Sequence, residues 1–118
     1  MKELKPILNI QSDKPEEDEE DMFDKEILME FYEDSLTKYS EITSALAEGD
    51  NKTARRLAHT LKSTSATIGK IKLQKAAADV ERLITNEKSS VTETELKILE
   101  TELNAVLKEL KPILNIQQ

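Results

Sequence analysis

The chain has 118 residues and a formal net charge of −7, and this length fits a single domain. With two glycines and three prolines it has too few turn formers for a many-stranded β fold, and without cysteine it has no disulfide framework or thiolate chemistry. No apolar run approaches the roughly 20 residues of a membrane span, and the N-terminus lacks a signal-peptide core, so we expect a cytoplasmic protein without membrane contact.

Residues 1–22 are expected to lie outside the folded domain, which should span residues 23–118. Residues 16–21 are six consecutive acids without apolar periodicity, a pattern typical of a disordered linker. Residues 2–11 recur unchanged as residues 108–117. Either this repeat is a boundary effect, from a longer protein with related modules or an added segment, or the first copy adds a short extra helix to the bundle.

Four amphipathic segments are expected to form helices, at residues 24–49, 50–69, 71–85 and 92–112. Asp24 and Asp50 are suited to cap the first two, because a carboxylate accepts hydrogen bonds from free backbone N–H groups. Thr92 and Glu95 form a capping-box pattern at the start of the fourth, and Pro112 should kink or end it. The apolar stripe of the first helix comprises Leu28, Phe31, Ser35, Leu36, Tyr39, Ile42 and Leu46. Short connections between four such helices predict an all-α, up-and-down antiparallel four-helix bundle.

His59, the only histidine, falls on the polar face of the second helix. At about 100° per residue the core-facing positions of this helix gather on the opposite side. They are Ala54, Leu57, Ala58, Leu61, Ser65 and Ile68. A lone histidine is often a satisfied core residue, but this phase predicts an exposed imidazole. Its own face carries Arg55, Lys62, Ser63 and Ala66.

The charge pattern around His59 favours an imidazole that receives negative charge. Residues 51–78 contain seven lysines or arginines and no acid, although the whole chain is acidic. Lys62 follows three residues after His59, so its ammonium could contact a group attached to the ring. Ser63 and Ala66 are small and leave room for a partner to approach closely.

These residues resemble the signature of histidine phosphotransfer (HPt) domains of multistep phosphorelays. That signature reads H-x-L-K-[G/S]-x-[A/S]-x-x-[L/I/V]-G, with a leucine four residues later. The chain matches it from His59 to Gly69 and again at Leu73, and the wider resemblance covers residues 23–110. The departure is mild, since many relatives have glycine where this chain has Ser63. Gly69 also has an expected structural role, because it lies at the end of the second helix, where a left-handed residue is favoured.

The resemblance implies that His59 accepts a phosphoryl group from an aspartate of a response-regulator receiver domain and passes it to the aspartate of a second receiver. Mg²⁺ would come with the receiver, so no cofactor or metal is expected in this chain. Lys62, helped at longer range by Arg55, would neutralise phosphoryl charge, and Arg55, Ser63 and Ala66 would contact the receiver. The module would be attached to, or cut from, a hybrid sensor histidine kinase. The chain has no Gly-rich phosphate loop, so no kinase activity of its own is expected.

An antiparallel third helix should place a carboxylate beside His59. The histidine lies about ten residues before the turn that ends its helix, so Asp79 or Glu81, about as far after the turn, should be level with it. Such a carboxylate could accept from Nδ1–H and leave Nε2 free to attack. The resemblance favours Glu81, because HPt domains often carry glutamate or glutamine there. The alternative is an ordinary surface acid paired with Arg82 or Lys75.

Other functional classes stay open. A helical adaptor that docks a signalling partner without chemistry would not need His59. A nucleic-acid binder could use the basic segment, but the acidic total and the scarce aromatic residues weigh against contact with nucleic acid. A histidine-kinase dimerisation domain is less favoured still, since its motif ordinarily has threonine or asparagine and then proline after the basic residue.

Overall fold

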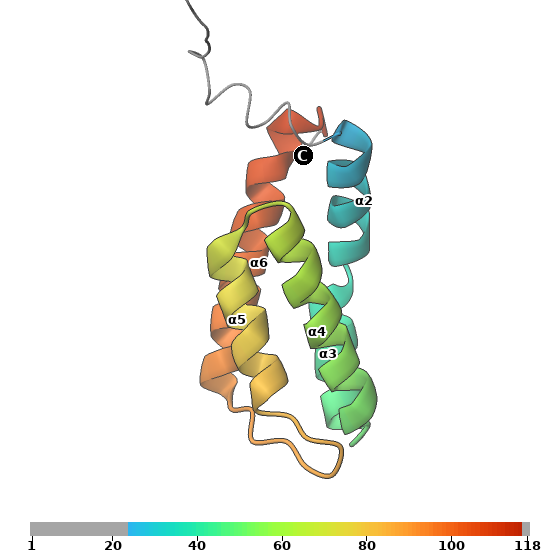
Figure 1. Cartoon of the computed structure of the whole chain (residues 1–118), viewed down its shortest axis with the longest axis vertical. Coiled ribbons are helices and arrows are strands. Elements are labelled where there is room, and N and C mark those ends of the chain that lie inside the picture. Colours follow the sequence, from blue (N-terminus) through green and yellow to red (C-terminus); the bar gives the residue numbers. More distant parts are fainter. Residues whose placement is uncertain (1–23, 117–118) are drawn as a thin grey trace, which may run out of the picture.

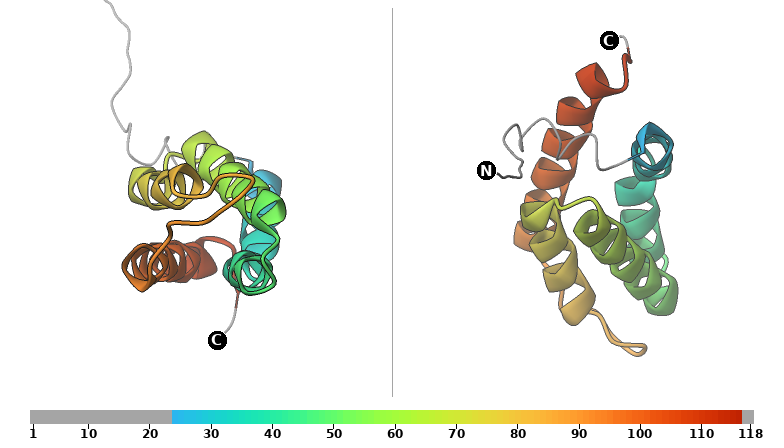
Figure 2. Two further views of the ribbon diagram at one scale, coloured as in Figure 1. Left: turned by 90° about the horizontal axis from the view of Figure 1, so that it is seen from below. Right: turned by 45° about the horizontal axis from the view of Figure 1, so that its top comes forward.

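The computed structural model of the chain describes residues 24–116, which fold into a bundle of helices (Figure 1). The helices are α2 (Lys25–Ser35), α3 (Lys38–Ala47), α4 (Asn51–Thr67), α5 (Ile71–Arg82) and α6 (Glu93–Ile113). α2 and α3 follow one another along one arm of the bundle, and α4, α5 and α6 form the other three. α4 packs between α3 and α5, α5 also packs on α6, and α2 contacts α6, so the four arms close around one core (Figure 2). The predicted all-α four-helix bundle is therefore confirmed.

The first arm is not the continuous helix expected for residues 24–49. α2 ends at Ser35, a turn follows, and α3 begins at Lys38. Thr37, at φ −110° and ψ 0°, leaves the helical conformation, and its hydroxyl donates to the Glu41 carboxylate at 2.8 Å. This bond joins two side chains, so the hydroxyl caps no backbone N–H of α3. The break turns Leu36 outward, so its predicted place in the core is wrong.

The predicted helix starts are confirmed by their caps. Asp24 and Asp50 each accept a hydrogen bond from a backbone N–H in the following turn, at 2.9 and 3.2 Å. Thr92 and Glu95 form the reciprocal capping box, in which the Thr92 backbone N–H donates to the Glu95 carboxylate at 2.7 Å. These bonds satisfy N–H groups that have no partner inside the helix.

The third predicted helix is shorter than expected, because α5 ends at Arg82 rather than Thr85. Ile84 leaves the helix and pairs with Ser89 in an isolated antiparallel bridge. The Thr85 hydroxyl accepts from two backbone N–H groups of the following loop, and such local bonding to the backbone competes with the helix. Ile84 stays buried in the core, whereas Leu83 is half-buried.

The C-terminal copy of the repeat is an integral part of the bundle. It forms the last turns of α6 and the residues that follow, and its Leu110 and Leu114 are buried. Pro112 is the second-to-last residue of α6 and Asn115 closes the helix end with a φ of 61°, so the helix ends beside the proline as predicted. The N-terminal copy, its extra helix and the acidic linker fall outside the described residues.

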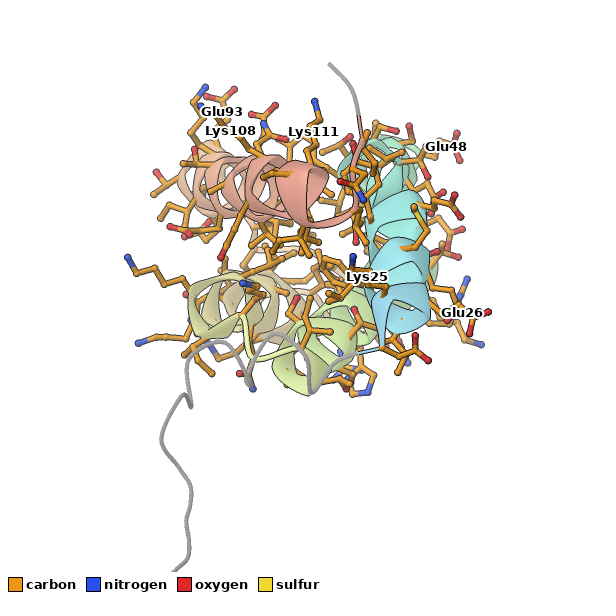
Figure 3. All side chains as sticks on the ribbon, turned by 90° about the horizontal axis from the view of Figure 1, so that it is seen from above. Lys25, Glu26, Glu48, Glu93, Lys108 and Lys111 are labelled. Carbon is orange, nitrogen blue, oxygen red and sulfur yellow. The ribbon has the colours of Figure 1, made fainter. Side chains whose placement is uncertain are left out.

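The core consists of apolar side chains from every arm. Its largest fully buried members are Ile42, Leu61, Leu73, Ile84, Leu99 and Leu110. The charged side chains Glu26, Glu48, Glu93 and Lys108 project away from the bundle, whose interior is filled by apolar groups (Figure 3). Among the described helices, none combines the length and apolarity needed to cross a membrane.

Candidate phosphoacceptor site

His59 lies in the middle of α4 on the side that faces solvent. Ala58 and Leu61, next to it in the helix, are fully buried and fix the rotation of α4 against the core. The His59 side chain is 56% exposed. The exposed imidazole follows from the helical phase, as the sequence predicts.

The turn between α4 and α5 sets which residue of α5 lies beside His59. Gly69 has a φ of +77°, a conformation that side chains with a Cβ rarely adopt. The Lys70 N–H donates to the Ser65 carbonyl at 2.9 Å and so closes the end of α4 in a Schellman motif. α5 then runs back along α4, which brings Glu81 level with His59.

Glu81 joins His59 to Lys62. Its Oε2 lies 2.8 Å from Nδ1 of His59, and its Oε1 lies 2.7 Å from Nζ of Lys62. Only 11% of the Glu81 side chain is exposed, so the carboxylate sits deeper than the ring that it contacts. The second candidate acid, Asp79, is exposed and pairs with Arg82 on its own helix at 3.3 Å. Of the two predicted acids, the structure places Glu81 against the imidazole.

The charge of Glu81 fixes the tautomer of His59. Burial raises the pKa of Glu81, but hydrogen bonds from Lys62 and His59, together with their charges, lower it more, so this pKa lies below its ordinary value. An ionised carboxylate can only accept hydrogen bonds, so Nδ1 of His59 carries the proton and donates it to Oε2. In the neutral ring Nε2 then holds the lone pair, and no residue of the described range 24–116 hydrogen-bonds to it.

A family model for the Hpt domain matches residues 26–109, more than two thirds of the chain. The chain belongs to the Hpt domain family. Membership implies histidine phosphotransfer in phosphorelays and interaction with receiver domains. The comparisons with curated proteins and with solved structures gave no match.

The other predicted site residues surround the imidazole of this Hpt domain along α4. Arg55, Ser63 and Ala66 are exposed, as a surface that contacts a partner requires. Lys62 is half-buried, and its ammonium is bound to Glu81. The sequence predicts that Lys62 contacts a group attached to the ring, and it does not predict this ion pair. The helix register that brings Glu81 to His59 also brings Glu81 within reach of Lys62, one turn further along α4. Within residues 24–116, no three histidine, aspartate or glutamate side chains gather as metal ligands would.

Glu81→Gln tests the charge of this carboxylate through the pH dependence of stability. A depressed carboxyl pKa stabilises the fold above the ordinary glutamate pKa of about 4.3 and loses that contribution as pH falls through the lowered value. At pH 7 the variant should lose on the order of 1–2 kcal/mol in the free energy of unfolding, because Lys62 is left without its charged partner. The deficit should shrink toward zero in acid, measured by urea denaturation at a series of pH values.

Glu102→Gln on α6 is the matched control, because Glu102 has no ion pair within residues 24–116. It should change stability by a few tenths of a kcal/mol at most. A deficit of Glu81→Gln that stays constant or grows on acidification would contradict the lowered pKa.

Proposed function

We propose that Nε2 of His59 accepts a phosphoryl group from an aspartyl phosphate of one receiver domain and passes it to an aspartate of a second receiver. The observation that carries this proposal is an exposed imidazole whose Nδ1–H is held by Glu81, which leaves the Nε2 lone pair free. We expect this to occur in the cytoplasm, with the donor receiver in a hybrid sensor histidine kinase.

In the forward step the Nε2 lone pair attacks phosphorus, the P–N bond forms, and the bond from phosphorus to the aspartate oxygen breaks. The aspartate leaves as a carboxylate, and Nδ1 keeps its proton. Positive charge that develops on the ring is stabilised by Glu81 at 2.8 Å. In the onward step an aspartate oxygen of the second receiver attacks phosphorus, the P–N bond breaks, and neutral His59 is restored.

Phosphoryl transfer depends mainly on positioning the in-line oxygens and nitrogen and on stabilising charge on the equatorial oxygens. We assign Mg²⁺ and most of this charge stabilisation to the receiver. On the Hpt side, the Lys62 ammonium is the cation that we expect to stabilise phosphoryl charge. The chain itself would have no autokinase activity.

A phosphotransfer assay against a panel of phosphorylated receiver domains tests the proposal. At least one receiver should phosphorylate the chain, and the phosphoryl group should be stable in base and labile in acid, as a phosphoramidate bond requires. A receiver that binds the chain but transfers nothing would instead support a non-catalytic adaptor.

Lys62→Ala should slow transfer in both directions by up to about tenfold. A charge-assisted contact contributes roughly 1.5–3 kcal/mol when buried, and the side chain is 32% exposed, so solvent screening reduces its effect. The variant should also shorten the lifetime of the phosphohistidine. Lys62→Arg, which keeps the charge, should retain most of the rate, and Lys97→Ala on α6 should retain all of it. Unchanged rates for Lys62→Ala would remove Lys62 from the mechanism.

A further inference from the structure

The helices of the bundle pack together less closely on one side than on the others. α4 packs closely on α3 and α5, and α5 packs on α6, whereas α6 makes only sparse contacts with α2 and α3. Figure 2 shows α6 and α3 together on the side of the bundle away from α4 and α5. The line along which α6 meets α2 and α3 is therefore the most open side of the bundle, and we call it the α6 seam.

Two grooves follow one another along the α6 seam. The first, of about 670 Å³, has Tyr39 of α3 on one side and the first turns of α6 on the other. The second, of about 330 Å³, lies between Tyr32 and Leu36 at the end of α2 and the second half of α6. A series of α6 residues that line the two grooves recurs every three or four positions and so shares one face of the helix. They are Glu93, Leu96, Glu100, Asn104, Leu107 and Lys111.

The α6 seam exposes apolar surface that the described helices do not cover. Leu36 is 55% exposed, because the break between α2 and α3 turns it outward. Tyr39, Leu96 and Leu107 are half-buried. Apolar side chains gain free energy when they leave water, so a further segment with apolar side chains would be stabilised in the seam.

The charges along the α6 seam change sign from one groove to the other. The first groove holds Glu93 and Glu100, and the exposed Lys97 also borders it. Burial and the negative charges of Glu100 and Glu93 raise the pKa of the Tyr39 phenol. Among the described residues, the lining of the second groove contains no acid and two lysines, Lys108 and Lys111. Charge complementarity therefore favours an occupant that is basic beside the first groove and acidic beside the second.

The repeated sequence supplies an occupant with suitable apolar side chains. The C-terminal copy packs in this bundle through Leu110 and Leu114, which are both buried. It already fills its own place in the core, so the N-terminal copy, residues 2–11, can dock only on a different surface. Leu4 and Leu8 of that copy correspond to the two buried leucines.

The order of charge before α2 matches the order along the α6 seam. Residues 16–21 are all acidic and stand shortly before Asp24, the cap of α2. α2 begins at the end of the bundle where α6 finishes, which is the end of the seam with the two lysines (Figure 1). Lys2 and Lys5, with the single acid Glu3, come earlier in the chain. A segment that runs from α2 along the seam therefore brings its acids to the lysines and its lysines to the acids.

The connecting chain is long enough for this path. An extended chain spans about 3.3 Å per residue, so residues 12–23 can reach up to about 40 Å. The seam from Lys111 to Glu93 measures about 27 Å along α6. Residues 2–11 can therefore reach both grooves of their own chain.

We propose that residues 2–11 dock in the α6 seam of their own chain and place Leu4 and Leu8 against Leu36. The acidic residues 16–21 then lie beside the lysines of the second groove. The docked segment covers the open side of the bundle. This contact goes beyond the proposed function, because the seam lies away from α4 and α5 and leaves the imidazole accessible to a receiver.

Leu36→Trp places a fluorescent reporter in the seam of the full chain, which has no other tryptophan. Because Leu36 is 55% exposed, the fold should stay intact. The docked segment should shield the indole from acrylamide. Replacement of both Leu4→Asn and Leu8→Asn removes the apolar contact, so the acrylamide quenching constant should rise about twofold. The shielding should be the same at low and high protein concentration, because the contact lies within one chain.

A second measurement leaves the seam itself unaltered. The chain has no cysteine, so Ser12→Cys can carry a single nitroxide label. The label should broaden the amide NMR signal of Asn104, in the second groove, more than that of Thr60 on α4. This difference should disappear when Leu4→Asn and Leu8→Asn are added.

Ile71→Trp is the matched control reporter, because Ile71 is 59% exposed at the start of α5 and lines neither groove. Its quenching should not respond to the two leucine replacements. Lys108→Glu should increase the quenching of the Leu36→Trp reporter, and less so at high salt. The inference is overturned if the leucine replacements leave that reporter unchanged or alter both reporters equally. Shielding that appears only at high protein concentration would assign the seam to a second copy of the chain and overturn the contact within one chain.

Discussion

Replacement of His59 by glutamine is expected to abolish phosphate acceptance and to leave the fold nearly unchanged. A glutamine amide has no nucleophilic nitrogen lone pair, so no phosphoramidate bond can form. The His59 side chain is 56% exposed and contributes no surface to the core. The glutamine amide N–H₂ can still donate to Glu81, which limits the cost in the free energy of unfolding to about 1 kcal/mol. Phosphoryl incorporation from a phosphorylated receiver is the measurement, with helicity and thermal melts alongside.

Lys52→Gln, an exposed substitution two turns earlier on α4, serves as the control and should accept phosphate normally. Phosphorylation of His59→Gln at the wild-type level would place the acceptor elsewhere in the chain. A cooperative loss of helicity would show that the imidazole stabilises the bundle, contrary to its exposure.

The geometry of the site could be predicted largely because two periodicities determine it. The helical repeat of α4 separates Ala58 and Leu61 from His59, so the exposed side of the imidazole follows from spacing alone. A short turn at Gly69 then fixes the antiparallel register of α4 and α5, and this register places residue 79 or 81 near the ring. The choice between Asp79 and Glu81 depends on the rotation of α5, which the buried Val80 and Ala77 set by packing.

The features that could not be predicted from the sequence depend on local backbone conformation or on how deeply a side chain is buried. The break at Leu36 coincides with the non-helical backbone of Thr37, which a periodic apolar pattern does not reveal. The pairing of Lys62 with Glu81 requires that the carboxylate lie below the surface between two turns of α4, which is a property of the packed helices. A groove between α2 and α4 combines side chains that are thirty or more residues apart in the chain.

Ser63→Trp is expected to block transfer from a receiver at least a hundredfold while it spares stability. Ser63 is exposed one turn beyond His59, on the same side of α4. An indole there would hold the receiver away from Nε2, and a displacement of about 1 Å from reactive geometry can cost a hundredfold in rate. Because the position faces solvent, the melting temperature should shift little. The measurement is the transfer rate from a phosphorylated receiver, with thermal melts of each variant.

Two comparisons make the expected block specific to docking. Lys97→Trp places the same bulk on an exposed position of α6 and should leave the transfer rate unchanged. Phosphoramidate, a small phosphoryl donor that releases ammonia as the bond to Nε2 forms, can pass beside an indole, so it should still phosphorylate His59 in Ser63→Trp at close to the wild-type rate. If Ser63→Trp accepts phosphate from the receiver as fast as the wild type, the receiver does not approach over Ser63.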